Sequence, residues 1–268
     1  MSWILLANDD GVDSPALVPF AQSLAKLAEV RVVVPDSERS WIAKAITRFE
    51  PVRVESVERE GVTIHACSGT PADGVQLGIH TLFDSPPDLV VSGINLGYNH
   101  GTAFLMSSGT VGAAAEGWLA GIPSIAVSTG VMADFLAWRS GASDPAVRPA
   151  WDRLAGVATE VVADIDRSGL AVDADVVSVN LPFEATGATE RRITKLARLG
   201  YDQLFHADED GYSHGFGGFV EFAPLEGTDV DAAHRGIVSV TPLHMPTHLG
   251  ASTAARETIE RAAQPPPR

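Results

Sequence analysis

The sequence predicts an α/β fold, a Rossmann-like parallel sheet flanked by helices, with β-hairpin arms in the C-terminal half. Short continuous apolar runs alternate with stretches of helical periodicity, which predicts strands that are buried on both faces and joined by helical crossovers. After residue 182 this alternation gives way to short extended segments, which predict hairpins in place of further strand–helix–strand units.

The first elements illustrate the pattern. Residues 3–7 form a short apolar run and therefore a buried strand. Ser14 and Pro15 predict a helix start, as N-cap and first helical residue, and residues 29–34 form the second strand. The remaining elements that we expect are a hairpin over 48–57 and 62–67, a helix from Thr70–Pro71, strands over 88–92, 122–128, 175–180 and 236–241, a glycine-rich loop over 93–109, helices over 110–119 and about 149–165, and arm segments over 191–202 and 217–223.

The length is compatible with a single domain over residues 1–268. We expect its core to take in about residues 1–182 and 236–245, its hairpin arms about residues 185–235, and a C-terminal helix about residues 252–263. Isolated hairpins are marginal in water and usually find a partner, so the arms predict self-association.

Charge and composition restrict the classes of function. The chain has 19 basic and 34 acidic residues, a formal net charge of −15, which would repel duplex nucleic acid. Cys67 is the only cysteine, so neither an internal disulfide nor a cysteine zinc site can form. The N-terminal apolar run lacks a preceding basic region and soon meets carboxylates, unlike a signal peptide, and no stretch approaches the roughly 20 apolar residues of a membrane span. We therefore expect a cytoplasmic protein with no membrane partner.

Polar side chains follow the predicted strands where a parallel sheet binds its ligands, at the carboxyl ends. Asp9 and Asp10 come directly after the first strand. Two adjacent carboxylates raise each other's pKa, and a hard divalent cation such as Mg²⁺, Mn²⁺ or Ca²⁺ relieves that conflict. The residues alone leave open the alternative that Asp9 or Asp10 caps the next turn.

The glycine-rich loop over 93–109 leads into a helix and predicts an anion site, because backbone N–H groups and the helix dipole favour phosphate there. Ser108 and Thr110 add hydroxyl donors. The alternative is a flexible loop with an ordinary Ser/Thr cap. The loop is not a P-loop, because no Gly-Lys-Ser/Thr follows, and an acidic pair stands where a dinucleotide fingerprint has glycines.

Taken together, these segments resemble the SurE survival-protein family. The matching segments keep their order along the chain and span roughly residues 3–245. They are Ile-Leu-Leu-Ala-Asn-Asp-Asp-Gly-Val-Asp-Ser from residue 4, Val-Val-Pro-Asp-Ser-Glu-Arg-Ser at 33–40, Gly-Thr-Pro-Ala-Asp at 69–73, Ser-Gly-Ile-Asn-Leu-Gly-Tyr-Asn at 92–99, Ser-Gly-Thr-Val-Gly-Ala-Ala at 108–114, Gly-Ile-Pro-Ser-Ile-Ala-Val-Ser at 121–128, Val-Asn-Leu-Pro at 179–182 and Ser-Val-Thr-Pro-Leu at 239–243.

The resemblance implies divalent-metal-dependent removal of phosphate from nucleoside 5′- and 3′-monophosphates, with one Mg²⁺ or Mn²⁺ per subunit. It also implies hairpin arms that mediate a homodimer or homotetramer. By matching motif, the implied metal ligands are Asp9, Asp10, Ser40 and Asn95. The implied phosphate contacts are Asn99, Ser108, Gly109 and Thr110. Which group takes the proton of the attacking water stays open, with Asp9 or Asp10 as the first candidate.

Several positions depart from the family pattern and leave the preferred substrate open. Trp41 and Lys44 replace residues usual in the family, Pro246 stands where aspartate is common, and the segment before Ser108 is longer by about one residue. His100, Tyr98 and Trp41 are candidates for contact with substrate. His244 and His248 have i,i+4 spacing, but the intervening proline disfavours a helical zinc pair.

Two other classes that use an acidic pair fit the sequence poorly, and two related functions fit it as well. A haloacid-dehalogenase-type phosphatase needs Asp-x-Asp after the first strand, and Gly11 occupies the second acidic position. A receiver domain would be about half as long and would lack the glycine-rich loop. A metal-stabilised nucleotide-binding or scaffold protein without activity, and a phosphatase for a non-nucleotide phosphomonoester, both stay open.

Overall fold

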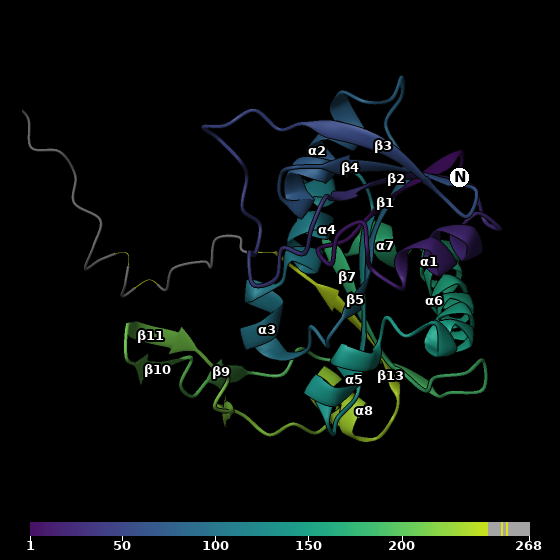
Figure 1. Ribbon diagram of the computed structural model, residues 1–268. Helices are drawn as coiled ribbons and strands as arrows, with labels where there is room; N and C mark the ends of the chain where they lie inside the picture. The colour runs from purple at the N-terminus through teal and green to yellow at the C-terminus, as the bar shows by residue number, and fades with distance from the viewer. Residues whose placement is uncertain (246–252, 254–255, 257–268) are drawn as a thin grey trace, which may run out of the picture.

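The computed structural model describes residues 1–245, 253 and 256. A nine-stranded sheet runs through the molecule in the order β3-β4-β2-β1-β5-β6-β7-β13-β8 (Figure 1). Neighbouring strands are parallel except in the β3–β4 and β7–β13 pairs, which confirms the predicted α/β class. The strands of this sheet are β1 Trp3–Ala7, β2 Glu29–Pro35, β3 Val54–Arg59, β4 Val62–Cys67, β5 Leu89–Leu96, β6 Ser124–Gly130, β7 Val176–Pro182, β8 Arg191–Ile193 and β13 Val238–Leu243.

Helices cover both faces of the sheet (Figure 1). They are α1 Leu17–Leu24, α2 Pro71–His80, α3 Gly101–Ser107, α4 Gly109–Leu119, α5 Phe135–Gly141, α6 Arg148–Ser168, α7 Leu170–Asp173 and α8 Asp229–His234, with a short 3-10 helix, η1, at Pro145–Val147. The side chains of β1 serve two cores, because successive residues of a strand point to opposite faces. Ile4 and Leu6 belong to the core beneath α1 and α6, whereas Leu5 and Ala7 belong to the core beneath α2 and α4.

Of two predicted helix starts, the one at Thr70 is confirmed and the one at Ser14 is wrong. Thr70 caps α2, because its hydroxyl accepts the N–H of Asp73 while the Asp73 carboxylate accepts the N–H of Thr70. The predicted cap at Ser14 is wrong, because α1 begins at Leu17 after Ala16. The Ser14 hydroxyl has no hydrogen-bond partner in the described structure, and the Ser14 carbonyl accepts the N–H of Leu17 in a preceding turn.

The predicted glycine-rich loop is largely regular structure. Strand β5 continues through residues 93–96, with a register shift against β6 between Ser92 and Asn95, and α3 occupies residues 101–107. Pairing with β6 therefore overrides the local preference of the glycines for a turn.

The expected arm is a long antiparallel ribbon within residues 199–221. Strands β9 Leu199–Tyr201 and β12 Phe219–Glu221 pair at its base, and β10 Phe205–Asp208 pairs with β11 Gly211–His214 at its tip. Figure 1 shows the tip extending away from the sheet. The segment expected to form arms, 185–235, also contains β8, which joins the main sheet beside β13, and α8.

Several features expected near the C-terminus fall on residues that the structure does not describe. Most of the predicted C-terminal helix over 252–263 lies outside the described residues, as do Pro246 and His248, and the two residues of that range that are described, Thr253 and Arg256, are helical. In the part of the chain that is described, no helix is long and apolar enough to cross a membrane.

Candidate functional site

The turn after β1 is closed by Asn8, not by either aspartate that follows. The Asn8 side chain donates to the carbonyl of Gly11 at 3.1 Å and accepts its N–H at 3.0 Å. Gly11 has a φ of +84°, and a Cβ there would lie 2.7 Å from the carbonyl carbon of Ser37. The glycine therefore lets this turn pack against the loop after β2, and both carboxylates stay available for another role.

Asp9 lies against the first turn of α4. The Asp9 side chain is buried, and its Oδ1 accepts the hydroxyl of Thr110 at 2.6 Å. A Cβ on Gly109 would lie 2.8 Å from the Asp9 Cβ, so only glycine permits this approach. Burial raises the pKa of Asp9.

Asp10 turns toward β5 and α5. Its Oδ2 accepts the N–H of Leu96 at 3.0 Å, and its Oδ1 lies 3.6 Å from Nη1 of Arg139. Burial, followed by repulsion from Asp9, raises the pKa of Asp10 to about 8. Sequence reasoning missed Arg139, which α5 places beside the pair; no motif around it marks it out.

The other two predicted metal ligands flank the pair. The backbone N–H of Arg39 donates to the Asp9 carbonyl at 2.8 Å, which fixes the adjoining Ser40 near β1. The Ser40 hydroxyl bonds to Glu38, and Glu38 is also held by Nη2 of Arg139 at 2.6 Å. On β5, the Asn95 amide donates to the Gly97 carbonyl at 2.6 Å, which leaves the Asn95 side-chain oxygen without a protein donor among the described hydrogen bonds.

This donor set fits a hard divalent cation. Two buried carboxylates with raised pKa values are an unfavourable arrangement that a cation relieves. Within the described residues, no group of three His, Cys, Asp or Glu side chains is placed to hold a metal ion by itself. A shell built on Asp9 and Asp10 must therefore be completed by hydroxyl, amide and water oxygens, which suit Mg²⁺ or Mn²⁺.

The predicted phosphate contacts occupy the N-terminus of α4 and the loop after β5. The Ser108 hydroxyl caps the helix by accepting the N–H of Val111 at 3.1 Å, so the ordinary cap considered as an alternative is present. The Thr110 hydroxyl donates to Asp9, which differs from its expected role as a free donor to phosphate. The backbone N–H groups at the start of α4 are the anion donors that this geometry leaves.

Asn99 is joined to the same edge of the sheet through β6 and β7. Its side-chain amide donates to the Ser128 hydroxyl at 2.9 Å, and its backbone N–H donates to the Asn180 side chain at 2.9 Å. Ser128 pairs in register with Asn95 on one side and with Asn180 on the other. The strand ends thus bring Asn99 beside the candidate cation site. Ser128 and Asn180 were not predicted as site residues, although both lie in the matched motifs.

His100 and Tyr98 pack on each other instead of facing outward together. Their rings stack with centroids 5.1 Å apart. His100 is 4% exposed, its Nδ1 has no hydrogen-bond partner in the described structure, and burial lowers its pKa. This arrangement indicates a packed loop and gives no evidence of the substrate contact for which both rings were candidates.

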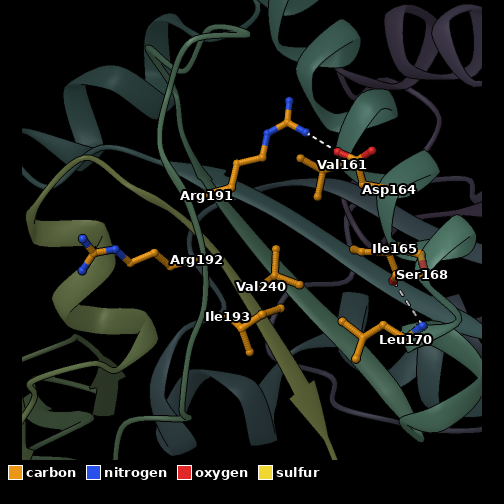
Figure 2. Close-up of a pocket in the computed structure, with 9 residues that line it drawn as sticks. All are labelled: Val161, Asp164, Ile165, Ser168, Leu170, Arg191, Arg192, Ile193 and Val240. Carbon is orange, nitrogen blue, oxygen red and sulfur yellow. Dashed lines mark hydrogen bonds and ion pairs between the residues drawn. The ribbon is translucent and has the colours of Figure 1, made fainter.

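A groove of about 270 Å³ lies away from this site, between α6, the edge strand β8 and its neighbour β13 (Figure 2). Ile165, Ile193 and Val240 form part of its apolar lining, and Arg191 turns toward Asp164, 2.7 Å away. None of the predicted site residues lines it.

Comparison with known proteins gives a consistent result. The family model described as "Survival protein SurE" matches residues 4–203. The 5′-nucleotidase SurE of Methanocella arvoryzae is 39% identical over 265 residues, which cover 96% of this chain and 95% of the relative. That of Geobacter metallireducens is 37% identical over 266 residues, covering 97% and 98%. The crystal structure of the SurE protein from Aquifex aeolicus aligns with a TM-score of 0.71 and 31% identity, over 96% of this chain and 98% of the other. The chain therefore belongs to the SurE family.

Proposed function

We propose that this chain is a divalent-metal-dependent phosphatase of nucleoside 5′- and 3′-monophosphates. The observation that carries the proposal is the buried Asp9–Asp10 pair, of which Asp9 lies against the N-terminus of α4. The pair supplies cation ligands, and the helix start supplies phosphate donors. The relatives named 5′-nucleotidase support a nucleotide as the substrate.

Asp9, Asp10, Ser40 and Asn95 would hold one Mg²⁺ or Mn²⁺ per subunit. A cation bound there supplies charge neutralisation at the phosphate and activation of a water. A cation is also needed on general grounds, because a chain with a net charge of −15 would otherwise repel an anionic ester.

The chain's own residues orient the phosphate ester and accept the proton of the attacking water. The N–H groups of Gly109 and Thr110 point along the axis of α4 and bind the phosphate oxygens. Asn99, fixed by Ser128 and Asn180, adds an amide at the same edge. One carboxylate of the Asp9–Asp10 pair accepts the proton of the attacking water. The hydroxyl of Thr110 holds Asp9 in place through its 2.6 Å hydrogen bond.

We also propose that the chain is cytoplasmic and associates with copies of itself. The arm exposes large apolar side chains, including Phe205, Tyr212 and Phe222, which are 57%, 78% and 61% exposed. An exposed apolar ribbon of this kind is usually covered by a partner, which supports a homodimer or homotetramer.

Phosphate release from AMP and other nucleotides, with Mg²⁺ or Mn²⁺ and then with chelator, tests the function. We expect activity that chelator abolishes and that Asp9→Asn lowers at least about a hundredfold. Asp13→Asn is the matched control, because the Asp13 side chain is 79% exposed in the same loop, and it should retain activity. An inactive protein that still binds AMP regardless of chelator would refute the phosphatase and favour a nucleotide-binding scaffold.

A further inference from the structure

Trp41 has an unusual backbone conformation next to a proposed metal ligand. It directly follows Ser40, has a φ of +60° and is 42% exposed. A bulky side chain rarely adopts this left-handed conformation, and strained residues of this kind gather at functional sites when the surroundings hold them there. Burial of the indole ring alone does not explain the conformation, because the residue is only partly covered.

The loop that carries Trp41 is held firmly. The N–H of Ala43 donates to the Ser107 carbonyl at 3.0 Å, and Lys44 pairs with the buried Glu116 of α4. A Cβ on Gly112 would lie 2.3 Å from the Ala43 carbonyl oxygen, so the loop lies directly on α4. These contacts fix the position of the indole ring relative to the phosphate-binding end of that helix.

Three further rings surround the indole. The ring centroids of Phe104, Tyr201 and His214 lie 5.8, 5.4 and 4.9 Å from that of Trp41. Phe104 belongs to α3, which leads directly into Ser108, whereas Tyr201 and His214 come from the arm. We call these four residues the aromatic shelf. It extends from the residue after Ser40 to the helix before the phosphate donors.

Most of the other described groups around the cation site are charged or buried. On the side of α5, Arg139 and Glu38 present a charged pair, and beneath the site Asp9 and Thr110 are buried. A phosphate ester bound at Asp9, Asp10 and α4 must direct its organic group over a neighbouring surface. Two aromatic surfaces adjoin proposed ligands. Phe135 of α5 lies beside Gly97 and Asn95, and the four rings of the aromatic shelf follow Ser40. Nucleobases stack on aromatic rings with little dependence on sequence.

We infer that Trp41 is a specificity-determining residue that stacks on the nucleobase of the substrate. The inference rests on the proposed function and narrows it to phosphomonoesters that carry a base. Trp41 itself takes no part in the transfer of phosphate, so its contribution is to binding and is confined to substrates that reach the shelf.

The test compares AMP with ribose 5-phosphate, which presents the same kind of ester without a base. Trp41→Ala should lower kcat/KM for AMP about tenfold or more, mainly through KM, and change that for ribose 5-phosphate by less than about twofold. Trp41→Phe should recover most of the loss, since phenylalanine keeps a stacking ring. Phe49→Ala is the control, because Phe49 is 88% exposed further along the same segment.

Two outcomes would overturn the inference that Trp41 stacks on the nucleobase. One is an equal loss on both substrates, including a loss accompanied by a change in oligomer mass, which would make Trp41 an interface residue. The other is an unchanged kcat/KM for AMP in Trp41→Ala. Calorimetric binding of both compounds separates this inference from the proposed function. Tighter binding of AMP that depends on Trp41, without any release of phosphate, would refute the phosphatase while supporting the shelf.

Discussion

Replacing Lys44 with methionine should destabilise the protein and weaken its hold on the proposed divalent cation. The Lys44 ammonium pairs with Glu116, whose side chain is only 6% exposed, whereas that of Lys44 is 36% exposed. Gln76 also donates to Glu116, at 2.5 Å. The substitution keeps most of the unbranched stem of the side chain but leaves a buried carboxylate with one remaining partner.

The expected loss of unfolding free energy in Lys44→Met lies between two limits. Removing one member of a fully buried ion pair costs about 3–5 kcal/mol, and an exposed pair contributes about 1 kcal/mol or less. Because Lys44 is half-buried and Gln76 remains, we expect Lys44→Met to lower the free energy of unfolding by about 2 kcal/mol. Glu116→Gln should cost less, about 1 kcal/mol, because an amide can replace the carboxylate. The double variant should cost less than the sum of the two single variants.

Denaturant unfolding of the four proteins gives these values, with Lys26→Met as a control at an exposed lysine. The concentration of Mn²⁺ that gives half-maximal phosphate release should rise in Lys44→Met, because the same loop carries Ser40. An unfolding free energy of Lys44→Met within about 0.5 kcal/mol of the wild type would show that the pair does not hold the loop, and the reasoning would be wrong.

Three further substitutions test the site. Gly109→Ala places a Cβ 2.8 Å from that of Asp9, so unfolding measurements should show a loss of about 1–3 kcal/mol and assays a sharp fall in activity. Gly156→Ala, where a Cβ meets nothing within 4 Å, should show neither effect. Thr110→Val keeps the shape but removes the donor to Asp9; it should cost about 1–3 kcal/mol by the same measurement, and no change would refute a structural role for this bond. His100 has a pKa lowered from 6.5 by burial, so stability is lost as pH falls below 6.5 and the ring must take up a proton. His100→Phe should flatten the dependence of unfolding free energy on pH in that range, and an unchanged slope would contradict the assignment.

Much of the core could be predicted because its strands are continuous apolar runs buried on both faces. The run from Trp3 to Ala7 forms a buried strand as expected, and the Thr70-Pro71 signal starts α2 as expected. Such signals are local, so each needs only the neighbouring residues to be interpreted. The ordered motifs also gave the family, which the comparisons confirm.

The features that could not be predicted depend on contacts between distant segments. Glycines in residues 93–97 favour a turn locally, but pairing with β6 extends β5 through them. Arg139 reaches the carboxylate pair only because α5 folds back across the ends of the strands, and its flanking residues carry no motif. The sequence alone is equally compatible with Thr110 as a helix cap and as a hydrogen-bond donor to phosphate. Only the approach of α4 to Asp9 assigns its hydroxyl to the carboxylate.

Direct binding of Mn²⁺, measured by calorimetry on the metal-free protein, tests the central claim that Asp9 and Asp10 hold a divalent cation. The account predicts one ion per chain in the wild type and in Asp13→Asn, and affinity weaker by about tenfold or more in Asp10→Asn. Equal affinity in all three proteins would contradict it.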